Sequence, residues 1–197
     1  MQYKNNFFHV ENISTEKLAK KFHTPLYCYS YSKLRNNIIN FKKYFKKIDP
    51  LICFSVKSNS NISILNELKK KGCGADVVSI GELMAALKAG IEPKKIVFSG
   101  VGKTQKELEF AIKKNILLIN IESESEAILI NKISKKLSKI TRVGIRLNPN
   151  INPKTIKKIS TGTINDKFGL LEANFLDLCN KSKNFKNISI ECLSVHI

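Results

Sequence analysis

The sequence predicts an α/β fold: a parallel (β/α)8 barrel of the TIM type that is incomplete, with about six of its eight strands present. Short apolar runs of strand length alternate with amphipathic segments of helix length along the chain. The spacing of about twenty residues or slightly more from strand to strand suits βαβ units, which give a parallel sheet. Nearly every strand also ends on polar residues, which a barrel would gather at one rim.

The expected strands cover residues 51–56, 75–79, 95–99, 116–121, 142–147 and 188–196. The expected helices cover residues 30–48, 60–71, 82–88, 104–114, 123–138 and about 171–183, and residues 149–169 are expected to be less regular. Thr104 is a suitable N-cap, and Glu107 three residues later completes a capping box. A doubly wound open sheet has similar strand spacing, but it would concentrate function at one switch point rather than around a rim.

The length bounds the domain organisation. A barrel of this kind needs about 250 residues, whereas this chain has 197, of which 43% are hydrophobic and 25% charged. Residues 31–197 are therefore interpreted as a partial barrel, and the chain as an N-terminal fragment of a longer protein. Whether a shorter reading frame or a partial sequence is the cause stays open.

The charge of +18, from 34 Lys and Arg against 16 Asp and Glu, invites a nucleic-acid hypothesis. Only three of the cations are arginines, although nucleic-acid binders usually rely on the planar guanidinium. The lysines come in pairs spread along the whole chain, as expected for solvated helix faces. No nucleic-acid partner is therefore expected, and a basic RNA-binding protein is kept only as a remote alternative.

The chain has no apolar run of the roughly 20 residues that a membrane helix needs, and its start has no apolar signal core. We therefore expect no membrane association. The five cysteines are odd in number and show no C-x-x-C spacing. This pattern favours the reducing cytoplasm over a disulfide scaffold or a zinc finger.

Lys57 is the most informative residue, because it ends an apolar strand and should point into the barrel mouth. Desolvation would lower the pKa of its ammonium group and make the amine a nucleophile or a Schiff-base partner. A lysine that reaches solvent at the rim, or pairs with Asp76, is an equally good interpretation.

Two further polar residues lie in strands. Asp76 is an acid within an apolar strand, either a partner for a cation or a buried hydrogen-bond acceptor. His196 follows Val195 at the end of the last strand, where a role at the rim and a structural role are equally plausible. Three scattered histidines make a metal cluster improbable, so no metal site is predicted.

The run SGVGKT at 99–104 lies between a strand and a helix, where a phosphate-binding P-loop would be found. The P-loop pattern requires an earlier glycine at the position of Val97, which lies inside the strand. A tight strand-to-helix turn is therefore the preferred interpretation of Lys103 and Thr104. Similarly, Gly72-Cys73-Gly74 is interpreted as a helix stop rather than a dinucleotide loop.

Several motifs occur in one order along the chain: TPLYCY at 24–29, FSVKSNSN at 54–61, GADVVSIGEL at 74–83, IVFSGVGK at 96–103, NIES at 120–123, RLNP at 146–149, ISTG at 159–162, KFG at 167–169 and the terminal His196-Ile197. Together they resemble the N-terminal half of the diaminopimelate decarboxylase family, fold-type III enzymes that use pyridoxal 5'-phosphate and belong to the alanine-racemase-like barrel class. The resemblance begins near residue 24 and extends to the end of the chain.

The resemblance implies roles for particular residues. Lys57 matches the lysine that holds the cofactor covalently, and His196 matches the histidine that stacks on the pyridine ring. Asp76 matches an aspartate near the cofactor, and Arg146 a cofactor-binding position at the rim. Lys167 matches a rim position that lies near a dimer interface in related decarboxylases.

The implied reaction is decarboxylation of meso-2,6-diaminopimelate to L-lysine, the last step of lysine biosynthesis, by a cytoplasmic homodimer acting on a small amino acid. An ornithine- or arginine-type decarboxylase is the alternative. The phosphate-binding loop, the specificity residues and the catalytic cysteine of the family belong to its other half. We therefore expect this piece alone neither to hold the cofactor tightly nor to turn over.

Residues 1–30 are implied to be an arm of a β-domain built mostly from that other half. The apolar side chains of the arm would then lack partners, and it should pack poorly. They are Phe7, Phe8, Val10, Leu26 and Tyr27.

Overall fold

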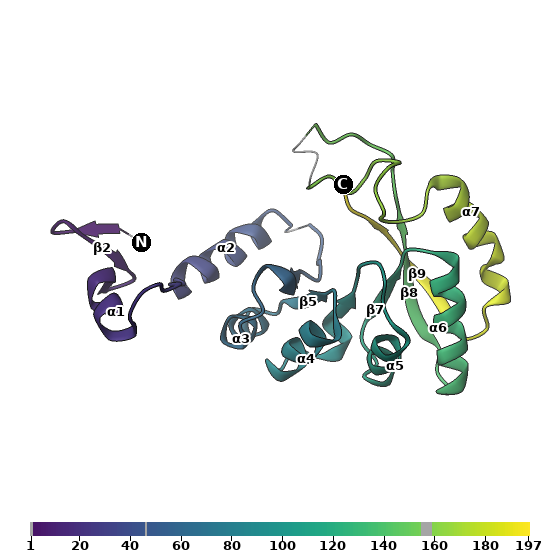
Figure 1. Ribbon diagram of the computed structural model, residues 1–197, viewed down its shortest axis with the longest axis horizontal. Coiled ribbons are helices and arrows are strands. Elements are labelled where there is room, and N and C mark those ends of the chain that lie inside the picture. Colours follow the sequence, from purple (N-terminus) through teal and green to yellow (C-terminus); the bar gives the residue numbers. More distant parts are fainter. Residues whose placement is uncertain (1, 46, 155–158) are drawn as a thin grey trace. The chain divides into compact units, whose positions relative to one another are not determined.

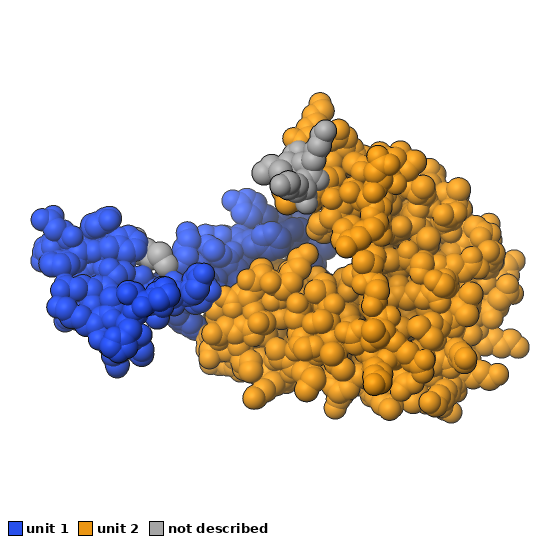
Figure 2. Space-filling model, in the orientation of Figure 1, with its two compact units in different colours: residues 1–50 blue, residues 51–197 orange. Residues whose placement is uncertain are grey.

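The computed structural model describes residues 2–45, 47–154 and 159–197 of the chain. It divides into two compact units, Met1–Pro50 and Leu51–Ile197 (Figure 2). Helix α2 (Tyr31–Lys43) lies within the first unit, so the compact units meet at a different point from the predicted boundary between residues 30 and 31. That boundary concerns the domains of a longer chain and stays a prediction.

The first unit begins with a small antiparallel sheet that the sequence analysis did not anticipate. Its strands are β1 (Gln2–Lys4), β2 (Phe7–Val10) and β3 (Ile13–Ser14), paired in that order. Helix α1 (Thr15–Phe22) follows directly, with the Ser14 hydroxyl accepting from the backbone of Lys17 as an N-cap.

The packing of this unit matches the expected poor packing only in part. Tyr27 is 87% exposed and Phe7 is 51% exposed, as unpartnered apolar residues would be. Val10, however, is buried, and the ring of Phe8 lies 5.1 Å from that of Tyr3. The short hairpin therefore covers some of the apolar surface that we had expected to be open.

The second unit contains the predicted parallel sheet, with six strands in the order β4-β5-β6-β7-β8-β9. The strands are β4 (Cys53–Ser55), β5 (Gly74–Val77), β6 (Ile96–Phe98), β7 (Leu118–Ile121), β8 (Thr141–Leu147) and β9 (Ile188–Val195). Their order in space is their order in sequence. A doubly wound sheet reverses direction at a switch point, so the observed order excludes that alternative for the described strands.

The helices of this unit are α3 (Ile62–Lys70), α4 (Ile80–Lys88), α5 (Gln105–Lys113), α6 (Glu124–Lys136) and α7 (Glu172–Lys181). Short 3-10 turns cover Val56–Ser58, Pro93–Lys95 and Ser182–Asn184. Because right-handed crossovers between neighbouring strands place successive helices on the same side, α3 to α6 follow one another along one face of the sheet (Figure 1).

Helices α4, α5 and α6 begin in the same way. Ser79, Thr104 and Ser123 each accept a hydrogen bond from the backbone of a glutamate three residues later. The predicted capping box of Thr104 and Glu107 is confirmed. These caps satisfy backbone donors that a helix start leaves free, and they fix where each strand-to-helix turn ends.

The strands alternate between two environments. Residues that face the helices are apolar and fully buried, for example Val77, Phe98 and Ile145. The residues between them on the same strands, such as Asp76 and Arg146, face the other side. Burial of each large apolar side chain contributes roughly 1.5–3 kcal/mol, so the helix-facing layer carries the stability and leaves the other face free for polar groups.

Several observed elements are shorter than expected at their ends, whereas α4 and β8 begin earlier than the expected residues 82 and 142. The strand predicted over 51–56 is only three residues long, because Val56–Ser58 turn into the 3-10 conformation. The last strand ends at Val195 rather than at residue 196. None of the described helices is both long and apolar enough to cross a membrane.

Gly74 offers a test of the register of the sheet. A Cβ atom at this position would lie 2.1 Å from the backbone oxygen of Lys95 and 2.9 Å from the sulfur of Cys53. We expect Gly74→Ala to lower the free energy of unfolding by about 1–3 kcal/mol or more, because backbone has to move. Urea denaturation of the purified chain measures this.

Gly81→Ala is the matched control. Gly81 lies in α4, and the nearest atom to its added Cβ is the Ser79 hydroxyl at 3.9 Å. Here alanine should leave stability unchanged or raise it by up to about 1 kcal/mol, since it restricts the unfolded chain. Equal effects of the two substitutions would show that the register of β5 is not as described.

Candidate active site

The carboxyl ends of the parallel strands surround a cavity of about 380 Å³. Every strand of the six, or the turn that follows it, contributes to the wall. Its polar lining residues are Cys53, Lys57, Asp76, Ser99, Asn120, Arg146, Thr161, Ser194 and His196. This volume lies within the range of about 300–1,000 Å³ that is usual for small-molecule sites.

The four predicted site residues, Lys57, Asp76, Arg146 and His196, all line this cavity. They come from four different strands or strand ends, so only the fold brings them together. Within the described part of the chain, no hydrogen bond or ion pair occupies the Lys57 ammonium group. Its amine is therefore available to a ligand.

Lys57 is exposed, which differs from the desolvated amine that the sequence suggested. Val56 immediately before it is fully buried and anchors the turn. Strand β4 has a hydrogen-bonded neighbour on one side only, β5. The side chain of Lys57 therefore lines the cavity while part of its length stays open to solvent.

Asp76 belongs to a chain of polar contacts across three strands. Its Oδ1 accepts a 2.6 Å hydrogen bond from the Ser99 hydroxyl, and Ser99 in turn accepts a 3.1 Å bond from Nδ2 of Asn120. The interpretation of Asp76 as a hydrogen-bond acceptor is thus confirmed. Ser99 and Asn120 were expected only as polar strand ends, and the structure shows them to be cavity residues.

The side-chain oxygen of Asn120 has no hydrogen-bond partner, although the residue is only 7% exposed. It lies over Gly144 on the next strand, where a Cβ atom would come within 2.4 Å of it. Buried polar atoms are usually paired. Among the described protein atoms, none donates to this oxygen, which is itself buried against Gly144.

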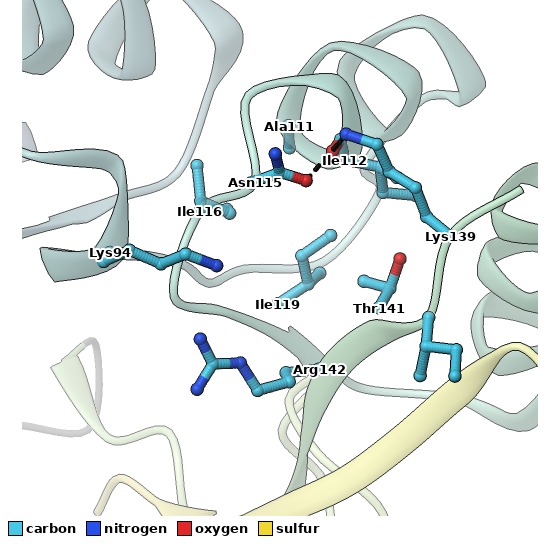
Figure 3. Close-up of a pocket in the computed structure, with 10 residues that line it drawn as sticks. Lys94, Ala111, Ile112, Asn115, Ile116, Ile119, Lys139, Thr141 and Arg142 are labelled. Carbon is cyan, nitrogen blue, oxygen red and sulfur yellow. Dashed lines mark hydrogen bonds between the residues drawn. The ribbon is translucent and has the colours of Figure 1, made fainter. Parts of the chain in front are cut away.

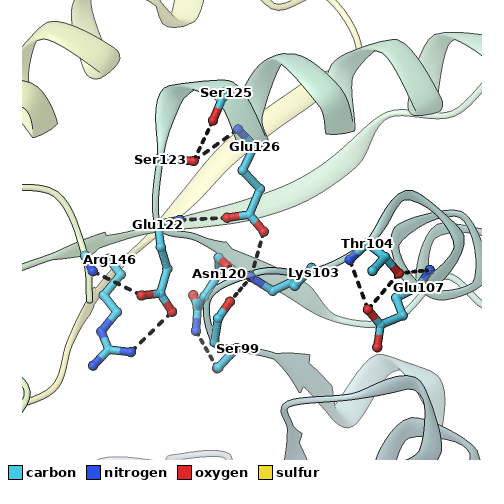
Figure 4. Close-up of polar contacts among 12 residues, drawn as sticks. Ser99, Lys103, Thr104, Glu107, Asn120, Glu122, Ser123, Ser125, Glu126 and Arg146 are labelled. Atoms are coloured by element: carbon cyan, nitrogen blue, oxygen red, sulfur yellow. Dashed lines mark hydrogen bonds and ion pairs between the residues drawn. The ribbon is translucent and has the colours of Figure 1, made fainter. Parts of the chain in front are cut away.

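Arg146 is held in the cavity wall by Glu122, which the sequence indicated only as a polar residue at a strand end, and by Phe168, for which sequence reasoning predicted no role. Its Nη1 lies 3.2 Å from Oε1 of Glu122 (Figure 4). Its guanidinium carbon lies 4.7 Å from the centre of the Phe168 ring. Glu122 follows β7 directly, so its place at a strand end was the available signal. Phe168 comes from the irregular segment after β8, for which no spacing rule exists.

His196 is fixed by Thr161, whose hydroxyl lies 2.6 Å from the ring Nδ1 and also donates to the His196 carbonyl at 3.2 Å. Partial burial lowers the pKa of His196 below its ordinary value of 6.5, and the positive charges of Arg146 and Lys57 lower it further. The carboxylates of Asp76 and Glu122 oppose this effect. The imidazole therefore presents a neutral ring to the cavity at neutral pH.

Lys103 has the structural role that the preferred interpretation of the SGVGKT segment required. Its side chain is 1% exposed and donates to Glu126 and to the backbone oxygens of Gly100 and Asn120 (Figure 4). Gly100 and Gly102 have φ angles of 97° and 75°, which form the tight turn. The ammonium group is thus used inside the protein and is not open to a phosphate.

Cys53 lines the same cavity but cannot serve as a nucleophile at neutral pH. Burial raises the pKa of its thiol to about 11, with a further contribution from Asp76. Among the described residues, no group of three or more His, Cys, Asp or Glu side chains is placed to hold a metal ion.

A second cavity lies at the opposite, amino-terminal ends of β7 and β8 and measures about 40 Å³. Lys139 closes it by donating to the carbonyls of Ile112 and Lys113 and to the side chain of Asn115 (Figure 3). This lysine satisfies the free carbonyls at the end of α5. The cavity is far below the size of a small-molecule site. The carboxyl-end cavity is the candidate active site because it gathers Lys57, Asp76, Arg146 and His196.

Residues 31–197 match the family described as "Pyridoxal-dependent decarboxylase, pyridoxal binding domain". This chain belongs to that family. The match begins at the first residue of α2 and continues through the whole sheet, so it includes every wall residue of the cavity.

The chain is also similar in sequence to individual diaminopimelate decarboxylases. The chain is 47% identical over 181 residues to a diaminopimelate decarboxylase of Helicobacter pylori, covering 92% of this chain and 44% of that relative. It is 41% identical over 195 residues to that of Aquifex aeolicus, with 98% and 46% coverage. The chain thus spans about half the length of the curated relatives it matches.

A solved structure shows the same fold. Diaminopimelate decarboxylase from Helicobacter pylori, complexed with L-lysine, matches this chain with a TM-score of 0.90 at 43% identity. The match covers 93% of this chain and 47% of that one.

The cavity fits the pyridoxal cofactor that the family description names. Lys57 offers an amine to an aldehyde, Arg146 a cation to an anionic oxygen, and His196 a flat neutral ring. These residues suit the aldehyde and ring of the cofactor.

The titration of His196 can be measured directly by NMR. In the chain without ligand, we expect its pKa to lie below 6.5 and to rise towards that value in Arg146→Gln, because a positive charge is removed. Since the folded state resists this protonation, the unfolded state binds more protons as the pH falls through 6.5. This site should therefore lower stability under acid conditions. An unchanged pKa in the variant would show that the guanidinium does not face the imidazole.

Proposed function

We propose that this chain provides the lysine-bearing half of a diaminopimelate decarboxylase, which converts meso-2,6-diaminopimelate to L-lysine and CO₂. The observation that carries the proposal is the convergence of Lys57, Asp76, Arg146 and His196 on one 380 Å³ cavity. The name of the relatives at 41–47% identity supports the choice of substrate.

Bound pyridoxal phosphate supplies an aldehyde for covalent attachment and an electron-poor ring that accepts the electron pair left by a departing carboxylate. The residues of this chain bind and orient. Lys57 would hold the cofactor covalently through its amine. His196, held by Thr161, packs its ring against the flat face of the cofactor.

The remaining wall residues place one positive and one negative charge beside the ligand. Arg146 offers guanidinium donors to an anionic oxygen of the cofactor, in a wall where few waters compete. Asp76 adds a carboxylate to the wall that Lys57 also lines and thereby favours a cationic partner in the cavity. Ser99 and Asn120 hold Asp76 in place through their hydrogen bonds.

We further propose that the sheet closes into an eight-stranded barrel when the rest of the relatives' length is present. Strand β9 pairs with β8 alone, and its Leu193 and Val195 are 58% and 47% exposed. Such an apolar strand edge is a template for another strand. The homodimer implied by the family resemblance, with exposed Lys167 near the interface, also stays a prediction.

Lys57 can be identified chemically as the attachment residue. We expect limiting pyridoxal phosphate followed by borohydride to label Lys57 first among the lysines, because its free amine faces a cavity that binds the ring. Peptide mass spectrometry locates the label, and Lys57→Ala should remove it. Lys106→Ala, on the exposed side of α5, is the matched control and should keep the label. Equal labelling of many exposed lysines would refute a specific site.

Activity can be tested by supplying the remaining length in trans. A polypeptide spanning the part of the Helicobacter pylori relative that this chain does not match is co-expressed with it, and CO₂ release is measured. We expect release from meso-2,6-diaminopimelate, loss in Lys57→Ala, and none from this chain alone. Release from ornithine or arginine instead would contradict the proposed substrate.

A further inference from the structure

Glu122 has a buried carboxylate whose two oxygens are both used around one cation. Its side chain is 3% exposed, and that of its partner Arg146 is 11% exposed. Oε1 lies 3.2 Å from Nη1 of Arg146, and Oε2 accepts a 3.0 Å hydrogen bond from the backbone N–H of Gly169. The carboxylate thus joins the guanidinium to the segment that covers it.

That segment surrounds Arg146 on its other sides. The Phe168 ring lies 4.7 Å from the guanidinium carbon. The Arg146 carbonyl accepts a hydrogen bond from Leu170, and Gly169 is so close to Arg146 that a Cβ atom would come within 3.0 Å of its carbonyl oxygen. Arg146 and Phe168 line the 380 Å³ cavity, whereas Glu122 does not. Arg146 is the residue of this cavity whose side chain the Glu122 carboxylate contacts, so Glu122 can act on a ligand there through Arg146.

We propose that Glu122 is a positioning residue that aims the guanidinium of Arg146 into the cavity, towards an anionic oxygen of the bound ligand. The identity of that ligand rests on the proposed function, whereas the arrangement of Glu122, Arg146 and the cavity is independent of it. A guanidinium has five N–H donors, and the carboxylate engages one of its terminal nitrogens. The other donors remain for the ligand.

The physical reason is the cost of holding a long cation in a partly buried place. Released from its carboxylate, an arginine side chain extends its head towards water and regains rotamer freedom. Glu122 opposes this movement, because its buried carboxylate would be left without a cationic partner if the guanidinium moved away. If the ion pair served stability alone, its loss would change stability without a specific change at His196 or in ligand capture. A structural role and a positioning role of Glu122 can therefore be separated.

His196 reports on the position of Arg146 in the absence of any cofactor. The charged groups that act on His196 are Arg146 and Lys57, which lower its pKa, and Asp76 and Glu122, which raise it. Arg146 has the largest effect of the four. In Glu122→Gln the carboxylate is gone. If Arg146 stays in place, the pKa of His196 falls. If Arg146 is released, the larger influence disappears and the pKa rises, as in Arg146→Gln.

The test is an NMR titration of His196 in the ligand-free chain carrying Glu122→Gln. We expect a rise towards the value in Arg146→Gln, and a fall would overturn the proposal. Glu122→Asp, which keeps the charge but shortens the reach, should also release Arg146 and raise the pKa. Should the glutamine variant not fold, the aspartate variant decides the question by the same readout.

Glu126→Gln is the matched control. Glu126 is also a mostly buried glutamate in an ion pair, with Lys103 at 2.8 Å, but it lies outside the 380 Å³ cavity. Its Oε2 accepts a 2.9 Å hydrogen bond from the backbone N–H of Glu122, and the amide oxygen of glutamine can keep that bond. This substitution should leave the pKa of His196 unchanged. An equal shift in the control would mean that any buried glutamate lost near β7 disturbs the site, which would overturn a specific role for Glu122.

Capture of pyridoxal phosphate gives an independent readout. We expect Glu122→Gln to raise the concentration needed for half-maximal borohydride-trapped labelling of Lys57 about tenfold or more, as the loss of a charged hydrogen bond to a ligand does. Unchanged labelling alongside a shifted His196 would overturn the claim that the guanidinium meets the ligand. Absence of specific labelling in the unsubstituted chain would instead contradict the proposed function, while the His196 shifts would still decide whether Glu122 positions Arg146.

Discussion

The parallel alignment of six strands in sequence order is the constraint on which the site depends. In such a sheet all carboxyl ends meet at one edge, and successive side chains alternate between two faces. On β5 to β8 the helix-facing set is apolar and buried, so the register of these strands is fixed by that packing. The polar set is consequently forced to the other face, where its members line one cavity.

Buried charge then determines which polar groups remain free. Lys103 and Arg146 both have carboxylate partners, but their surroundings differ. Lys103 is enclosed by Glu126 and two backbone carbonyls, so it fastens the turn before α5. Arg146 shares its carboxylate with a backbone N–H and keeps one face on the cavity. Lys57 has neither constraint and is left as the amine that a ligand can meet.

The irregular segment after β8 has more influence on the site than its lack of secondary structure suggests. Thr161 orients His196, and Phe168 covers the guanidinium of Arg146. Asn148 ties this segment down by donating to the carbonyls of Thr163 and Phe168. Two of the cavity's functional groups are therefore aimed by one loop rather than by the strands that carry them.

The sequence by itself determined the alternation of strands and helices, the capping box at Thr104 and the candidates Lys57, Asp76, Arg146 and His196, because periodicity, turn chemistry and motifs are local properties. The Ser-x-x-Glu pattern of Ser79 and Ser123 was equally readable, although the sequence analysis did not use it. Only the tertiary structure decided that Lys57 is exposed, that Glu122 and Phe168 hold Arg146, and that the sheet is singly wound. These depend on contacts between residues far apart in the chain, and no local pattern encodes the distance between two strands.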